Sequence, residues 1–231
     1  MRKYLDEAYE LSSSQLEQFA VYYRLLVEKN KVMNLTAITE EQEVYIKHFY
    51  DSLTITRVIN MSDITTVLDV GTGAGFPGIP LKIAFPHLKL TLLDSLQKRI
   101  RFLQEVGEEL GWDDVTYVHG RAEDIAQLSD YREHFDVVAS RAVAKINVLA
   151  EYCLPFVRVG GKCIAMKGSN VTEEMSNCKQ ALFILGKSTH QVHPLVLPEK
   201  MGERNIITID KKESIPMKYP RKSGVIKKSP L

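Results

Sequence analysis

The amino-acid sequence predicts an α/β fold in which helices cover both faces of a mainly parallel sheet. From about residue 61 onward, short apolar runs typical of buried strands alternate with amphipathic segments of helical periodicity. The clearest run leads into a glycine-rich turn and then a helix, within residues 67–83. With 231 residues, the chain is long enough for one sizeable domain and an appendage.

Residues 1–60 predict an N-terminal helical extension. Ser14 and Glu17 have the spacing of a capping box and precede apolar residues at helical intervals. Thr39 is expected to cap a second helix that continues toward Val58.

The sheet is predicted within residues 61–210. Apolar runs predict strands at residues 67–70, 89–94, 135–139 and 162–166, and residues 205–209 predict a late strand. The clearest helix between them begins after Ser95. A basic C-terminal segment, residues 211–231, follows and carries no regular pattern.

The charges of the chain are unevenly distributed, although the formal net charge of +1 by itself argues against a nucleic-acid partner. Residues 211–231 carry a net charge of +6, whereas the rest of the chain carries −5. A basic segment suits phosphate groups and an acidic body suits a cationic ligand, so this distribution is compatible with RNA binding.

The composition excludes several other classes of protein. With 45% hydrophobic and 26% charged residues, the chain is neither disordered nor fibrous. Three cysteines without a CxxC pair predict no metal site and fit a reducing cytoplasm. No run approaches the roughly 18 apolar residues of a membrane span, and the N-terminus lacks the apolar region of a signal peptide.

The glycine-rich turn predicts a nucleotide-like ligand. Gly73, Gly75 and Gly78 match the G-x-G-x-x-G pattern of dinucleotide enzymes, which is weak evidence alone. Asp69, two residues before Gly71, makes the pattern resemble the first motif of S-adenosylmethionine-dependent methyltransferases. An acid there suits the ammonium group of that cofactor and would repel a pyrophosphate. The alternative is a structural turn in which Asp69 caps the helix.

Two further strand ends complete the predicted cofactor site. Asp94 ends the next strand and can accept both ribose hydroxyls, which either ligand class requires. In Arg121-Ala122-Glu123, the Ala122 N–H and the Glu123 carboxylate can bond the adenine edge. A solvated helix start explains the same acid equally well.

The loop Ser140-Arg141-Ala142 is expected at the methyl-donating end of the ligand. The chain lacks the Asn/Asp-Pro-Pro-aromatic motif of amino-group methyltransferases, and none of its cysteines is placed like a nucleophile. The site therefore offers an arginine and no evident base. Guanine N7 suits such a site because it carries a lone pair and no proton. Arg141 can hold O6, a phosphate or the cofactor carboxylate; its alternative is a structural ion pair.

These motifs together resemble the bacterial small-subunit ribosomal RNA methyltransferase G family, formerly called glucose-inhibited division protein B. The ordered set covers almost the whole chain: Asn34-Leu35-Thr36, His48-Phe49 with Asp51-Ser52-Leu53, residues 69–83, residues 92–96 with Lys98-Arg99, Arg121-Ala122-Glu123, Ser140-Arg141-Ala142, Lys167-Gly168 and Tyr219-Pro220-Arg221-Lys222. One departure lies in the tail, where Val225-Ile226 replaces the family's usual Thr-Pro.

The resemblance implies a Rossmann-like S-adenosylmethionine-dependent methyltransferase fold, with a seven-stranded sheet that is parallel except near its end. It implies N7 methylation of one guanosine in 16S ribosomal RNA in the bacterial cytoplasm. We expect the RNA to be part of a 30S particle, although the sequence leaves naked RNA open, and no obligate protein partner is evident from the sequence. It also implies a cofactor site lined by Gly71, Phe76, Ala122, Glu123 and Arg141.

Basic residues near the predicted strand ends are candidates for RNA contact: Lys98, Arg99, Lys167, Arg204, Arg221 and Lys222. Solvated surface charge is the alternative for each of them. His48 and Asp51, three residues apart on a helix, fit a capping or buried hydrogen-bonded pair better than a place on the active side.

Three alternative functions remain open at this stage. A nicotinamide-dependent oxidoreductase would use the same loop, although Asp69 argues against it. A non-catalytic RNA-binding or ribosome-assembly factor would keep the fold without the reaction. A small-molecule methyltransferase would not need the basic residues 211–231.

Overall fold

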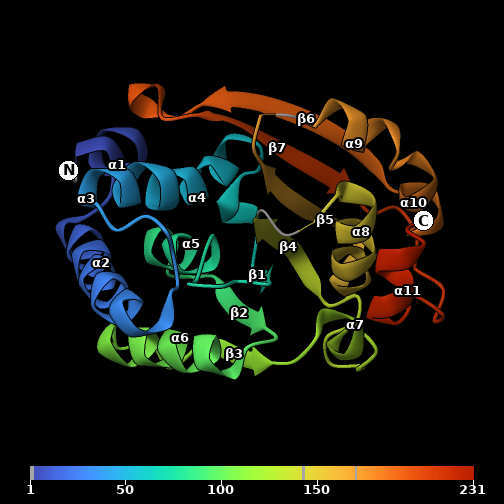
Figure 1. Ribbon diagram of the computed structural model, residues 1–231, viewed down its shortest axis with the longest axis horizontal. Coiled ribbons are helices and arrows are strands. Elements are labelled where there is room, and N and C mark those ends of the chain that lie inside the picture. The colour runs from blue at the N-terminus through green and yellow to red at the C-terminus, as the bar shows by residue number, and fades with distance from the viewer. Residues whose placement is uncertain (1–2, 142–143, 170) are drawn as a thin grey trace.

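The computed structural model describes residues 3–141, 144–169 and 171–231, and these residues form a seven-stranded sheet (Figure 1). The strand order is β3-β2-β1-β4-β5-β7-β6, and β7 alone runs antiparallel to its neighbours in the described sheet. This confirms the predicted fold class. The strands are β1 (Thr66–Val70), β2 (Lys89–Asp94), β3 (Thr116–His119), β4 (Phe135–Arg141), β5 (Val157–Lys167), β6 (Thr189–Val196) and β7 (Glu203–Asp210).

Helices pack on both faces of the sheet, as the sequence predicts (Figure 1). One face carries α5 (Gly78–Ala84) and α6 (Gln97–Glu109), and the other carries α8 (Ile146–Cys153). Successive strand residues point to opposite faces, so Val67 and Leu68 belong to different hydrophobic clusters. The remaining helical segments of this part are Met61–Asp63, α7 (Ala122–Ile125), Leu154–Phe156, α9 (Thr172–Ser176), α10 (Lys179–Ile184), Pro198–Lys200 and α11 (Ser223–Lys228).

The N-terminal residues pack into the same hydrophobic cluster as α5 and α6. They form α1 (Lys3–Tyr9), α2 (Ser13–Met33) and a helical run made of α3 (Glu41–Val44), a π-helical segment (Tyr45–Tyr50), α4 (Asp51–Leu53) and a final turn (Thr54–Arg57). No helix in residues 3–141, 144–169 or 171–231 is long and apolar enough to cross a membrane.

Both predicted helix caps were wrong by one or two residues. Ser12 and Gln15 form the capping box of α2, because Ser12 has extended backbone angles and Ser14 already lies within the first turn. Glu40 caps α3 through a 2.9 Å hydrogen bond to the backbone N–H of Glu43, so Thr39 lies one residue too early.

Candidate cofactor and RNA site

The glycine-rich turn after β1 is fixed by the buried carboxylate of Asp69. Its Oδ2 accepts hydrogen bonds from the Thr72 hydroxyl at 2.7 Å and from the Gly78 N–H at 2.9 Å. A Cβ at Gly78 would lie 2.5 Å from Leu92, so only glycine lets the first turn of α5 approach β2 so closely. Asp69 therefore ties the turn to the start of the helix.

Asp69 lies beneath the turn and does not reach the cavity described below. It is completely buried, and burial raises its pKa to about 6 despite the two hydrogen bonds. Its second oxygen, Oδ1, is buried without a hydrogen-bond partner among the described residues. The geometry thus gives Asp69 the capping role that the sequence left as an alternative. That the charge of Asp69 helps to bind a cationic ligand remains a prediction.

Helix α2 supports the same turn from the other side. The Tyr22 hydroxyl donates a 2.6 Å hydrogen bond to the Ala74 carbonyl, and its ring packs 5.6 Å from that of Phe76. A Cβ at Gly75, where φ is +108°, would lie 2.8 Å from the Tyr22 oxygen. The N-terminal helices therefore form part of the framework that positions the turn.

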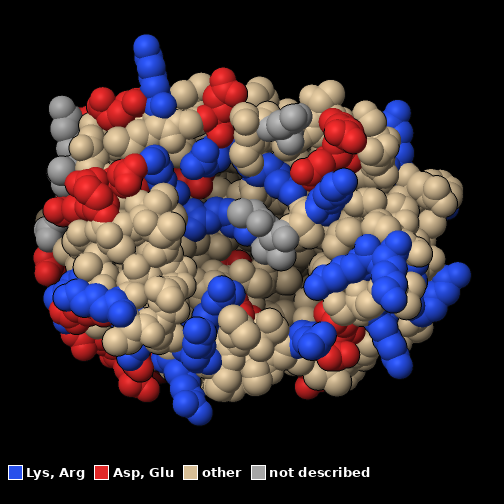
Figure 2. Space-filling view, viewed as in Figure 1, with Lys and Arg blue, Asp and Glu red and all other residues tan. Residues whose placement is uncertain are grey.

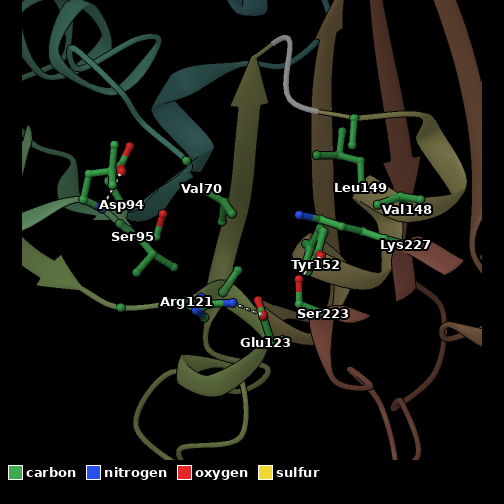
Figure 3. A pocket seen from close by; sticks show the side chains of 16 residues that line it. Val70, Asp94, Ser95, Arg121, Glu123, Val148, Leu149, Tyr152, Ser223 and Lys227 are labelled. Carbon is green, nitrogen blue, oxygen red and sulfur yellow. Dashed lines mark hydrogen bonds and ion pairs between the residues drawn. The ribbon is translucent and has the colours of Figure 1, made fainter. Parts of the chain in front are cut away.

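A cavity of about 620 Å³ opens at the carboxyl ends of β1, β2 and β3 (Figure 3). It brings together four of the predicted cofactor residues: Gly71, Asp94, Ala122 and Glu123. Gly73, Gly75, Phe76 and Arg141 are not among its lining residues. The opposite wall was not foreseen. It consists of residues from α8, from the loop before α8 and from the C-terminal segment, namely Ala144, Val148, Leu149, Tyr152, Ser223 and Lys227.

Asp94 joins the cavity to the glycine-rich turn. Its Oδ2 accepts from the Gly73 N–H at 2.9 Å and from Arg99 at 3.1 Å, and its Oδ1 accepts from the Leu96 N–H at 2.9 Å. A carboxylate has about four lone-pair sites, so three are already used. A ribose hydroxyl can take the fourth, and a second hydroxyl requires that Arg99 move.

Glu123 and Arg121 lie on the floor of the cavity, at the start of α7. The Glu123 carboxylate is nearly buried and lies 3.9 Å from the Arg121 guanidinium (Figure 3). With Asp94, it gives the cavity two carboxylates, and Arg121 and Lys227 add two cations to the lining.

Arg141 lines a second, smaller hollow of about 370 Å³. Its guanidinium lies 4.5 Å from the ring centre of Phe76 and within 3.3 Å of both the Lys47 carbonyl and His48 Nδ1. It also lies 3.4 Å from the buried carboxylate of Asp51. The structural ion pair that the sequence left as the alternative for Arg141 is therefore present. Ala142, which follows Arg141 in the motif, lies outside the described residues.

His48 and Asp51 are site residues that the sequence reasoning undervalued. Both contact Arg141, and Asp51 also pairs with Arg204, whose Nε lies 3.2 Å from Asp51 Oδ1. Burial and the adjacent Arg141 lower the pKa of His48 to about 3, so its ring is neutral at physiological pH. His48 Nδ1 lies between the Arg141 guanidinium and the Lys47 carbonyl, which is 3.1 Å away, and Nε2 lies 2.8 Å from the Thr36 hydroxyl. The motif His48-Phe49 with Asp51-Ser52-Leu53 was the signal that could have identified them.

Two of the predicted RNA-contacting residues lie in the part of the molecule that holds Arg141, and a third, Arg99, lies beside Asp94. Lys167 and Arg204 line the hollow beside Arg141, together with Lys47. Lys167 pairs with Glu174 at 3.0 Å, and Arg99 pairs with Asp94. Figure 2 shows Lys and Arg side chains gathered around a hollow near the centre of the viewed face, and more of them over α11.

The other three predicted contacts differ in exposure. Lys98 and Lys222 are exposed to solvent. Arg221, in contrast, pairs at 2.6 Å with Glu151, which is completely buried. Its guanidinium is therefore engaged inside the protein, and Lys211 is likewise buried against Glu133.

Comparison with solved structures establishes the fold class. An O-methyltransferase from Bacillus cereus in complex with S-adenosylhomocysteine superimposes with a TM-score of 0.62 at 17% identity, over 91% of this chain and 96% of its own. The sheet order and this superposition define a Rossmann-like α/β fold of the kind that this methyltransferase has.

Comparison with sequences establishes the family. The family model GidB, described as rRNA small subunit methyltransferase G, matches residues 15–207. Two relatives named ribosomal RNA small subunit methyltransferase G are 52% identical over 225 residues (an Exiguobacterium species) and 53% identical over 221 residues (Brevibacillus brevis). These alignments cover 97% and 96% of this chain and 94% and 93% of the relatives. The chain belongs to the rRNA small subunit methyltransferase G family, as its motifs predicted.

Proposed function

We propose that this protein transfers a methyl group from S-adenosylmethionine to N7 of a guanosine in 16S ribosomal RNA. The observation that carries the proposal is the match of residues 15–207 to the rRNA small subunit methyltransferase G family. The proposed substrate is the RNA within a 30S particle, in the bacterial cytoplasm.

The residues around the larger cavity fit S-adenosylmethionine. A volume of about 620 Å³ lies within the usual range of roughly 300–1,000 Å³ for ligand pockets. Asp94 retains an acceptor site for a ribose hydroxyl, and Glu123 lies where an adenine amino group can donate to it.

The chain's residues act on the reaction by positioning. Bound S-adenosylmethionine supplies an electrophilic methyl carbon attached to a sulfonium. Guanine N7 attacks with its own lone pair, so no residue has to remove a proton first. Arg141 cannot usefully donate to N7, because that would occupy the attacking lone pair. It can instead hold O6 or a phosphate, which aligns the base for in-line attack.

The buried groups near Arg141 agree with a mechanism that needs no base. Both ring nitrogens of His48 have partners, and Asp51 is held between Arg141 and Arg204. All three cysteines are buried. Contact with Cys163, together with burial, raises the pKa of the Cys153 thiol, which disfavours the thiolate that a nucleophilic mechanism requires.

Methyl transfer to particles lacking the modification tests the proposal against its alternatives. Purified protein and labelled S-adenosylmethionine should label such 30S particles and leave fully modified particles unlabelled. Transfer to neither would favour a non-catalytic assembly factor. Binding of a nicotinamide dinucleotide in place of S-adenosylhomocysteine would favour an oxidoreductase.

A further inference from the structure

The C-terminal segment is held against α8 by a buried ion pair. Arg221 donates to both oxygens of the Glu151 carboxylate, Nε to Oε1 at 2.8 Å and Nη2 to Oε2 at 2.6 Å. The Arg221 backbone N–H adds a third hydrogen bond at 2.8 Å. Glu151 has no exposed surface, so loss of its partner would leave a buried charge unpaired. This contact therefore fixes where the chain lies at residue 221.

Further contacts hold the chain before and after Arg221. The Arg132 guanidinium donates to the carbonyls of Tyr219 and Ile215, each at 2.8 Å. Beyond Arg221, the side chain of Ile226 is completely buried in the cluster that includes α8. The segment is thus packed as part of the domain, although its composition predicted an irregular basic tail.

The residues placed by these contacts face the proposed cofactor cavity. The hydroxyls of Tyr152 on α8 and Ser223 on α11 lie 3.0 Å apart. Both residues line the cavity together with Lys227, on the wall opposite Asp94 (Figure 3). The Lys227 side chain extends along this wall with its ammonium group toward the cavity (Figure 3).

We propose that residues 219–228 complete the S-adenosylmethionine pocket, and that Arg221 is a positioning residue for cofactor binding that acts through Glu151. The inference rests on the proposed function for the identity of the ligand. Glu151 and Tyr152 are consecutive on α8, so the ion pair and the Tyr152–Ser223 hydrogen bond hold the two halves of the wall together. Without that wall the cavity opens to solvent, which removes apolar contact from the ligand and weakens its attraction to the two carboxylates.

The experiment measures S-adenosylhomocysteine affinity by calorimetry on the full chain. Glu151→Gln should weaken binding at least ten-fold, and Tyr152→Phe, which removes only one hydroxyl, should weaken it about three-fold. Lys212→Gln is the matched control, because Lys212 lies in the same basic segment but outside residues 219–228, is exposed and does not line the cavity. This control should bind like the unmodified protein. Should Glu151→Gln fail to fold, Tyr152→Phe and Ser223→Ala remain to decide the question.

Two further readouts separate positioning from general destabilisation. S-adenosylhomocysteine should slow amide hydrogen exchange of residues 219–228 in the unmodified protein. In Tyr152→Phe, the KM for S-adenosylmethionine should rise while kcat at saturation stays the same. Unchanged affinity in both Tyr152→Phe and Ser223→Ala, with no exchange protection of residues 219–228, would overturn the inference. That result would leave the methyltransferase proposal intact. Failure of methyl transfer with normal cofactor binding would instead contradict the methyltransferase proposal and leave this inference about the pocket intact.

Discussion

Asp94 gives the sharpest test of the cofactor site. Replacing it by Asn keeps the shape and one acceptor oxygen but removes the charge. Hydrogen bonds to a charged group are worth roughly 1.5–3 kcal/mol, so loss of one ribose contact predicts S-adenosylhomocysteine binding about 10- to 150-fold weaker. Because Asp94 also holds the Gly73 N–H at 2.9 Å, Asp94→Ala should weaken binding further.

Arg99 provides the comparison that isolates the ribose contact. It occupies one lone pair of Asp94 Oδ2 at 3.1 Å, so Arg99→Ala should leave S-adenosylhomocysteine affinity unchanged or raise it, while weakening RNA binding. Calorimetry measures the affinity for S-adenosylhomocysteine, and a filter-binding assay measures the affinity for 16S RNA. Folded Asp94→Asn protein that binds S-adenosylhomocysteine as tightly as the unmodified protein would refute the ribose role.

Three other residues give separate predictions. Arg141→Ala should lower methyl transfer about 100-fold. It should shift the thermal unfolding midpoint little, because Asp51 keeps Arg204 as a partner. Parallel losses of activity and stability would indicate a purely structural role for Arg141. Burial raises the pKa of Asp69 in the folded protein from its ordinary value of 3.8 to about 6, so the stability of the fold decreases as pH rises through this range. Between pH 4 and pH 7, the free energy of unfolding in urea should therefore rise by about 2 kcal/mol for Asp69→Asn relative to the protein with Asp69, and a constant difference would contradict this. The pH dependence of stability due to His48 has the opposite sign. Because its pKa in the folded protein is about 3, stability falls as pH drops below 6.5. Relative to the His48→Gln variant, the protein with His48 should lose about 2 kcal/mol of its free energy of unfolding by pH 5. Equal pH profiles of the unfolding free energy in the two proteins would count against a buried neutral ring.

The sequence predicted the features that depend on residues close together in the chain. The glycine-rich turn, Asp94 at a strand end and the pair Ala122-Glu123 each belong to a local strand–turn–helix pattern, and the structure places them around one cavity. The edge strand β6 was missed, because most of its residues are partly or fully exposed and it contains no apolar run.

The contacts that connect distant segments could not be predicted from one sequence. Asp51 meets Arg141 and Arg204, and Glu151 meets Arg221, only because packing brings these segments together. A charged residue shows no sign in the sequence of whether its partner is another side chain or a ligand. Arg221 was accordingly predicted to contact RNA, whereas its side chain is bound to a buried carboxylate.

The structure also shows where the cations of the basic segment, residues 211–231, lie. The basic segment lies beside the proposed cofactor cavity, where Ser223 and Lys227 line the wall. Two of its cations, Lys211 and Arg221, are engaged in internal ion pairs. The lysines that remain exposed, among them Lys222, are the ones available for RNA phosphates.

The most direct test of the central claim is to map the methyl group on 16S RNA after reaction with unmodified 30S particles. Nuclease digestion and mass spectrometry should find 7-methylguanosine at a single position, and much less of it after the same reaction time with Asp94→Asn or Arg141→Ala protein. Methylation of another base, of another atom of guanine or of no RNA at all would contradict the proposed reaction.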